Sequence, residues 1–260
     1  MLKSFFSVLI LISFVFLVSC GDEAVEQLSA KALFEKAVKL YQEEEYTKAA
    51  TEFNNLSYIA AGTEYEDQAK FYLGMSYFQQ KNYIQASDAF EQLIRTNAGS
   101  ILVPDASYYK ALSYYKMSPR SSLDQTNAIE AIADFQTFID YFPAHAKVKD
   151  AIEKITELRE KLGKKEYENG ITYMKLEYYK SATTYFQYVI DKYYDTQYAE
   201  KAMAGKVESL YYRKRWDEME AEYAKFIEKY PGSEMTKDVE KVIANSKVER
   251  GLIPRNSSSN

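Results

Sequence analysis

Small and large apolar residues recur along the chain at spacings that suit pairs of packed helices. The clearest copy lies in residues 170–190, GITYMKLEYYKSATTYFQYVI, where Gly170 occupies the inner face of a first helix. Tyr179 closes the turn that follows, and Ala182 and Phe186 lie on the facing side of a second helix. Small residues suit positions where two helix backbones approach closely, and large residues fill the space beside them. The segment therefore predicts a helix–turn–helix hairpin.

The same spacing occurs four more times, which predicts a repeat protein. The matching positions are Ala37, Tyr46, Ala49 and Phe53; Gly74, Tyr83, Ala86 and Phe90; Ala111, Ala131 and Phe135; and, more weakly, Val207, Trp216, Met219 and Tyr223. A helix–turn–helix unit of about 34 residues is the tetratricopeptide pattern. The predicted fold is therefore all-α, a right-handed superhelical solenoid of about five tetratricopeptide repeats over residues 29–248. We expect residues 249–260 to form a flexible C-terminal tail.

Two segments depart from the regular repeat. Residues 117–127, MSPRSSLDQTN, lengthen the turn of the third repeat, where Pro119 and Asp124 indicate a loop that ends in a helix N-cap. Insertions of this kind map to surface loops and often lie on a binding face, although an ordinary surface loop fits the pattern equally well. Residues 147–165 carry charges of both signs at helical spacings. We expect them to form a largely solvated helix that connects the third repeat to the fourth.

The N-terminal residues 1–19 predict a lipoprotein signal peptide that is not part of the fold. Lys3 supplies a short positive region, and residues 5–18 form an apolar run too short to span a membrane comfortably. The run ends in Leu-Val-Ser before Cys20, the only cysteine of the chain, and this tetrad resembles the lipobox of bacterial lipoproteins. We expect acylated Cys20 to begin the mature chain, with residues 20–28 as a lipidated tether. An ordinary secretory peptide with an incidental cysteine is the alternative.

Composition and charge exclude several functional classes. The formal net charge of −5 provides no basic field, so nucleic acid is not an expected partner. His145 is the only histidine, and nothing places a serine nucleophile near it, so neither a metal site nor a Ser–His–acid triad is expected. The glycines are scattered singly and form no phosphate-binding loop. These observations favour a binding protein that is not an enzyme and uses no cofactor.

The first helices of the first three repeats carry apolar side chains at positions i, i+4 and i+7, which line the concave groove of a tetratricopeptide array. The predicted substrate-binding residues at these positions are Phe34, Tyr41, Phe71, Phe78, Tyr108 and Tyr115. A groove of aromatic side chains suits an extended segment with alternating aromatic residues, as at the end of a β-barrel strand. The alternative is that superhelical packing buries these residues against the next repeat.

The lipobox, the repeats and the long third turn together resemble the BamD family, lipoproteins of the outer-membrane β-barrel assembly (BAM) machinery. The most specific residues are Arg120, Asp124 and Gln125 of the long turn, with Tyr-Phe-Pro at residues 141–143 ending the next helix. The Asp-Thr-Gln of residues 195–197 is similar to another element of the family.

The resemblance implies a non-enzymatic scaffold, anchored by lipid to the outer membrane on its periplasmic face. The C-terminal repeats are then expected to bind the periplasmic POTRA region of BamA, with Lys201 as the partner-binding residue. The N-terminal repeats are expected to receive unfolded outer-membrane β-barrel proteins. A periplasmic tetratricopeptide lipoprotein scaffold of another envelope pathway, such as cell-wall or division coordination, is the alternative function.

Overall fold

The computed structural model describes residues 30–254, and this part of the chain contains α-helices and turns but no β-strand. The helices are α1 (Ala30–Gln42), α2 (Tyr46–Ile59), α3 (Glu66–Gln79), α4 (Tyr83–Thr96), α5 (Val103–Met117), α6 (Thr126–Tyr141), α7 (Val148–Lys175), α8 (Tyr179–Lys192), α9 (Gln197–Tyr212), α10 (Trp216–Lys229) and α11 (Thr236–Glu249). The signal peptide, the whole tether with Cys20, and residues 255–260 lie outside the described residues.

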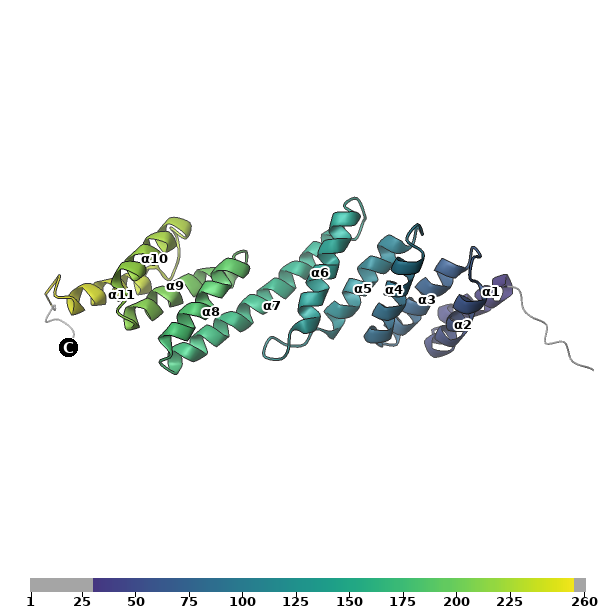
Figure 1. The fold of residues 1–260 in the computed structure, drawn as a ribbon, viewed down its shortest axis with the longest axis horizontal. Helices are drawn as coiled ribbons and strands as arrows, with labels where there is room; N and C mark the ends of the chain where they lie inside the picture. The colour runs from purple at the N-terminus through teal and green to yellow at the C-terminus, as the bar shows by residue number, and fades with distance from the viewer. Residues whose placement is uncertain (1–29, 255–260) are drawn as a thin grey trace, which may run out of the picture.

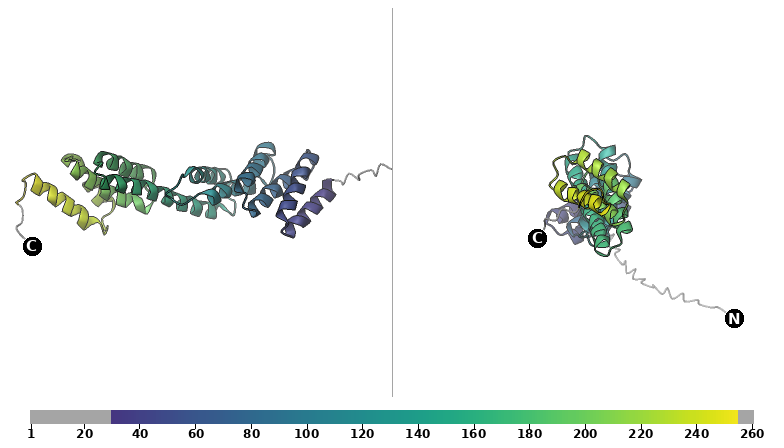
Figure 2. Two further views of the ribbon diagram at one scale, coloured as in Figure 1. Left: turned by 90° about the horizontal axis from the view of Figure 1, so that it is seen from below. Right: turned by 90° about the vertical axis from the view of Figure 1, so that its left-hand side faces the viewer.

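The helices form a long row of antiparallel hairpins (Figure 1) with a narrow cross-section when viewed along the row (Figure 2). The hairpins are α1/α2, α3/α4, α5/α6, α7/α8 and α9/α10, and each second helix also packs against the first helix of the next hairpin. Helix α11 packs mainly on α9 at the C-terminal end. The core is therefore shared between neighbouring repeats, as in other solenoids. The prediction of an all-α tetratricopeptide solenoid is confirmed.

Glycine and phenylalanine meet where the two helices of a hairpin approach most closely. A Cβ atom built on Gly74 would lie 2.6 Å from the ring of the fully buried Phe90. In the fourth hairpin, a Cβ atom on Gly170 would lie 2.5 Å from the ring of Phe186, and one on Gly205, in the first helix of the next hairpin, would lie 2.8 Å from the same ring. A methyl group does not fit at these distances, so the close approach requires glycine. The small and large positions that predicted the hairpin are thus its contact points.

Four of the hairpins share the same tight turn between their helices. One residue of each turn has a left-handed backbone although none of the four is glycine: Glu44, Lys81, Glu177 and Lys214 all have φ between 56° and 62°. The next N–H reaches back across the turn, as from Asn82 to the carbonyl oxygen of Tyr77 at 2.9 Å. This pattern is the Schellman C-cap, which usually takes glycine at the left-handed position. The hairpin packing therefore holds these turns against the local preference of their side chains.

Helix α7 is a single helix of 28 residues, so the prediction of a separate, largely solvated connecting helix over residues 147–165 is wrong. Its first half buries Ala151, Leu158 and Leu162 beside the third hairpin. Its second half includes Gly170 and is the first helix of the fourth hairpin. The charges that suggested a solvated helix occupy only the face that the apolar residues leave free.

The fifth hairpin differs from its predicted packing by one helical turn. Tyr223, the predicted large residue, is half-buried, whereas Phe226 and Met219 are fully buried. Residues three positions apart lie on the same side of a helix, so the prediction identified the correct face and the wrong residue.

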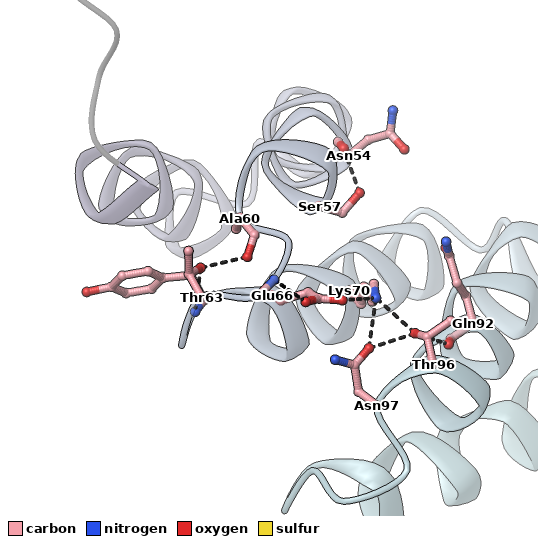
Figure 3. A network of polar contacts seen from close by, with 11 residues as sticks. Asn54, Ser57, Ala60, Thr63, Glu66, Lys70, Gln92, Thr96 and Asn97 are labelled. Atoms are coloured by element: carbon pink, nitrogen blue, oxygen red, sulfur yellow. Dashed lines mark hydrogen bonds and ion pairs between the residues drawn. The ribbon is translucent and has the colours of Figure 1, made fainter.

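A buried lysine ties the turn before α3 to the end of α4. Lys70 donates hydrogen bonds to Glu66 at 2.6 Å, to Thr96 at 2.9 Å and to Asn97 at 2.8 Å (Figure 3). The backbone N–H of Gly62 donates to the other carboxylate oxygen of Glu66 at 2.6 Å. The pKa of Glu66 is lowered to about 2, most strongly by the Gly62 N–H and next by Lys70. All three donors of the lysine ammonium group are used, which allows its burial.

Candidate protein-interaction surfaces

Four of the predicted substrate-binding residues form an aromatic layer between the first three hairpins. These residues are Phe34, Tyr41, Phe71 and Phe78, and all four are half-buried. The rings of Phe34 and Tyr41 both contact Tyr72 of the next hairpin, with ring-centroid distances of 6.1 and 5.4 Å. The rings of Phe71 and Phe78 both contact Tyr109, which corresponds to Tyr72 in the third hairpin, at 6.3 and 5.6 Å. Each ring thus packs against the next hairpin and still presents part of its surface to solvent.

The other two predicted residues are tied to α7 through their hydroxyl groups. Tyr108 is only 6% exposed, and its hydroxyl donates to Asp150. Tyr115 is half-buried, and its hydroxyl donates to Glu157. The pKa of Tyr115 is raised to about 12, mainly by its hydrogen bond to Glu157 and to a smaller extent by burial. The pKa of Tyr108 is also raised, mainly by burial and to a smaller extent by its hydrogen bond to Asp150. These two tyrosines therefore hold the third hairpin to the fourth, and their role in substrate binding stays a prediction.

Polar contacts of nearly constant sequence separation link α5 and its following turn to α7. The contacts of this polar ladder are Asp105–Lys147, Tyr108–Asp150, Tyr115–Glu157, Ser118–Lys161 and Leu123–Lys165, each between residues 42 or 43 positions apart. A constant separation means that α5 and α7 run parallel in a fixed register. An ordinary repeat is about 34 residues long, so the extra length is taken up in the long turn. The insertion leaves the stacking of the hairpins intact.

The long turn, residues 118–125, is organised by the side chains that the family resemblance singled out. Gln125 is buried, and its Nε2 donates to the carbonyl oxygens of Arg120 at 2.9 Å and Leu123 at 3.0 Å. Asp124 accepts a hydrogen bond from the N–H of Thr126, the first residue of α6, at 3.0 Å. Contacts with Thr126 lower the pKa of Asp124. Within the described residues, the side chain of Arg120 is exposed and makes no hydrogen bond or ion pair.

Two lysines of α7 hold this turn from outside, and we call them the lysine strap. Lys161 donates to the hydroxyl of Ser118 and to the carbonyl oxygen of Pro119 at 2.9 Å. Lys165 donates to the carbonyl oxygen of Leu123 at 2.7 Å. Burial lowers the pKa of Lys161. The sequence pattern did not identify the strap, because its acceptors are mostly backbone oxygens distant in the chain.

Lys201 opens into a cavity of about 200 Å³ between α7, α9 and α11. Ile171 and Val242 contribute apolar walls, and Asp238 adds a carboxylate. The Lys201 ammonium group lies 5.1 Å from the centroid of the Tyr198 ring. The cavity therefore combines apolar surface with charges of both signs, which suits a polypeptide side chain more than a small apolar ligand.

The Asp-Thr-Gln element at residues 195–197 makes a structural contact. The guanidinium group of Arg159 donates to both carboxylate oxygens of Asp195, from Nε at 3.0 and 2.7 Å and from Nη2 at 2.6 Å. This contact raises the pKa of Arg159 and lowers the pKa of Asp195. The bidentate pair joins α7 to the turn before α9. Arg159 was not identified from the sequence, since its partner lies in a different repeat.

Among residues 30–254, no three potential metal ligands gather, and no helix has the length and apolar character needed to cross a bilayer. A row of stacked hairpins with an aromatic layer, an ordered long turn and a mixed cavity defines the class of tetratricopeptide-type binding proteins.

The chain belongs to the YfiO family, described as outer membrane lipoproteins, whose family model matches residues 26–225. This match confirms the resemblance to the BamD family. The family is one of outer membrane lipoproteins, which supports the expected membrane of residence. A search among curated protein sequences found no match.

Several solved structures are similar to this chain at low sequence identity and low TM-score. The TPR2AB domain of yeast Sti1, solved in its pHSP90 complex, has 11% identity and a TM-score of 0.40, with 86% of this chain and 84% of that chain covered. A tetratricopeptide repeat protein from Parabacteroides merdae has 15% identity and a TM-score of 0.37, with 85% of this chain and 73% of that chain covered. A thermophilic TPR protein from Thermus thermophilus has 16% identity and a TM-score of 0.36, with 85% of this chain and 100% of that chain covered.

Proposed function

We propose that this protein is a non-enzymatic scaffold of the BAM complex, held by lipid on Cys20 at the periplasmic face of the outer membrane. In this proposal, the C-terminal repeats bind the POTRA region of BamA, and the N-terminal repeats bind unfolded barrel proteins. The observation that carries the proposal is the match to the outer membrane lipoprotein family over residues 26–225.

The N-terminal aromatic layer supports the substrate role. Phe71 lines a cleft of about 350 Å³ together with Tyr72 and Leu102. Aromatic rings supply a large apolar contact area at a small cost in side-chain entropy, and barrel strands end in belts of aromatic residues. The cleft and the half-buried rings of α1 and α3 are thus suited to an extended, aromatic-rich segment.

The cavity at Lys201 supports the role of the C-terminal repeats. A surface lysine beside apolar walls can pair with a carboxylate of a partner while a neighbouring apolar side chain fills the cavity. The family resemblance assigns the C-terminal repeats to BamA, and Lys201 is the residue that carries this assignment.

Affinity purification from detergent-solubilised membranes tests the partner assignment. BamA is expected to co-purify with the wild-type protein and to be reduced with Lys201→Glu, because the substitution reverses the charge at the cavity. Lys180→Glu on α8, exposed and outside this cavity, is the matched control. Recovery of cell-wall or division proteins in place of BamA would instead support the alternative pathway.

Crosslinking to a peptide from the C-terminus of a barrel protein tests the substrate site. Phe78→Ala and Tyr115→Ala should weaken crosslinking while BamA association is retained. Ile84→Ala removes an exposed apolar side chain from α4 and should have no effect. Normal crosslinking by both variants, with folding preserved, would show that these rings are only packing residues.

A further inference from the structure

Basic side chains of α7 and of the turn before it repeatedly lie near a tyrosine ring while they pair with a carboxylate. The three cases are Lys147 with Asp105 and Tyr109, Lys154 with Asp150 and Tyr115, and Arg159 with Asp195 and Tyr193. The distances from cation to ring centroid are 5.1, 4.9 and 5.8 Å in the same order. The ring and the carboxylate both attract the cation. A carboxylate beside tyrosine rings is therefore the setting in which this protein holds basic side chains.

The fourth hairpin, α7/α8, contains the same setting around an open cavity. Glu166 of α7 lines this cavity together with Thr184, Tyr185 and Tyr188 of α8, and its volume is about 240 Å³. We call it the Glu166 cavity. The Glu166 carboxylate accepts a hydrogen bond from Nδ2 of Asn169 at 3.1 Å, and no lysine or arginine of residues 30–254 forms an ion pair with it. The cavity thus has the carboxylate and the rings of the other three cases, and it has space where they have a cation.

The two tyrosines of the Glu166 cavity are held by other rings. Tyr173 stacks on Tyr185 with 5.1 Å between the ring centroids, and Tyr193 meets Tyr188 edge-on at 6.0 Å. Burial raises the pKa of Tyr185, and Tyr173 and Glu166 raise it further. Burial also raises the pKa of Tyr193 to about 12, with smaller contributions from Tyr188 and Glu166. The negative charge of Glu166 therefore acts on both ring pairs, and the same charge favours a cation in the cavity.

We propose that the Glu166 cavity binds a lysine or arginine side chain of a partner polypeptide. The cation pairs with Glu166, and the apolar stem of the side chain lies against the rings of Tyr185 and Tyr188. The site goes beyond the proposed function and does not depend on it. None of its four lining residues belongs to the aromatic layer or to the cavity at Lys201.

The size of the cavity favours a single side chain as the occupant. Pockets that hold drug-sized ligands usually have volumes of about 300–1,000 Å³, and this cavity is smaller. A phosphatidylethanolamine headgroup also offers an ammonium group, but it carries a phosphate close by. No basic residue lines the cavity to receive that phosphate, and Glu166 would repel it. Lysine and arginine carry their positive charge alone, so they suit the cavity better.

An NMR titration of the full lipidated protein, in micelles of an uncharged detergent and with carbon-labelled tyrosine rings, tests the proposal. The probe is the capped peptide Gly-Ser-Arg-Ser-Gly, and the reference is the same peptide with glutamine in place of arginine. The arginine peptide should shift the ring signals of Tyr185 and Tyr188 and reach saturation, whereas the glutamine peptide should not. Added salt should weaken the binding, because the interaction is electrostatic and the cavity is open to solvent.

Variants of the lining residues locate the bound cation. Glu166→Gln should weaken the arginine peptide by about tenfold, because the cation loses its charged partner. Tyr188→Leu should also weaken it, whereas Tyr188→Phe keeps the ring and should bind as the wild type does. Glu168→Gln is the matched control, since it removes an exposed carboxylate of α7 that does not line the cavity.

Three results of this titration overturn the proposal. Equal shifts with both peptides would mean that the cavity takes uncharged polypeptide. Absent shifts, or shifts that persist in full with Glu166→Gln, would mean that no cation binds in the cavity. Vesicles of phosphatidylethanolamine that produce the same shifts without peptide would assign the cavity to a lipid headgroup. Purification of BamA reports on the proposed function separately in every case.

A second test supplies the cation from the protein itself. Thr184 is exposed and lines the cavity, so Thr184→Lys places an ammonium group there. Thr184→Lys should raise the thermal midpoint above that of Thr184→Gln, which has a similar helix propensity. The difference should disappear when each variant is combined with Glu166→Gln. A gain of equal size in both backgrounds, or no gain in either, contradicts the proposal.

Discussion

The closest helix contacts in this protein depend on single missing methyl groups. Gly170→Ala is expected to destabilise the fold by about 1–3 kcal/mol, because the new Cβ would overlap the buried ring of Phe186. Urea unfolding monitored by circular dichroism measures the effect. Gly232→Ala is the matched control, since nothing lies within 4 Å of a Cβ at that position. Equal stability of the two variants would mean that the ring moves aside without cost.

Acid should weaken the Lys70 network through Glu66. The folded-state pKa of Glu66 is about 2 and lies below the ordinary value of 4.5. Ionised Glu66 therefore stabilises the folded state fully above about pH 4.5, and this contribution is lost as the pH falls towards 2. At pH 7, Glu66→Gln should lower the free energy of unfolding by about 1–3 kcal/mol, as expected for a hydrogen bond to a charged group.

The pH dependence of Glu66→Gln distinguishes this contribution from those of other carboxylates. The difference in unfolding free energy between wild type and Glu66→Gln should shrink as the pH falls from about 4.5 to about 2, in urea titrations at each pH. Glu153→Gln removes an exposed carboxylate from α7 and should give no such difference at any pH. A wild-type–variant difference that stays constant across this range would count against the role of the Glu66 carboxylate.

Helices and hairpins follow from the sequence where packing residues of the same kind recur. Ala182, Phe186 and their equivalents in the first three hairpins are buried as predicted, because small-to-large spacing reports the contact between two neighbouring helices. The continuity of α7 was not predicted, since mixed charge indicates a solvated face and says nothing about the opposite face. The sequence left open whether Tyr108 is buried or lines a groove, because a stripe of apolar residues does not reveal which helix covers it.

The lysine strap leads to a prediction about the long turn. Lys161→Ala with Lys165→Ala should leave the helices folded but increase cleavage by trypsin after Arg120, because the turn loses its contacts to α7. Lost hydrogen bonds to charged groups cost about 1.5–3 kcal/mol each, and most of this cost falls on the local opening of the turn. Limited proteolysis followed by mass spectrometry measures the rate.

A neighbouring lysine provides the control for the strap. Lys164→Ala removes an exposed lysine of α7 whose ion pair with Glu168 lies within the same helix. Cleavage after Arg120 should then proceed at the wild-type rate. If the double variant is also cleaved at that rate, Gln125 alone is sufficient to order the turn.

The arrangement of the whole molecule was predicted in outline and not in its surfaces. Repeat spacing indicates how many hairpins stack, because each stacked pair must bury its own apolar face. It does not indicate which side chains of different repeats meet, since those contacts form only when helices distant in sequence align. The cavity at Lys201 and the polar ladder both require the folded row to be recognised.

A row of independent repeats can bend at every boundary, but α7 removes one of these boundaries. The helix continues without interruption from the third hairpin into the fourth, from Val148 to Lys175. Bending between the third and fourth hairpins would therefore require α7 itself to kink. The third and fourth hairpins should therefore move together when the row bends, and bending should concentrate at the other boundaries.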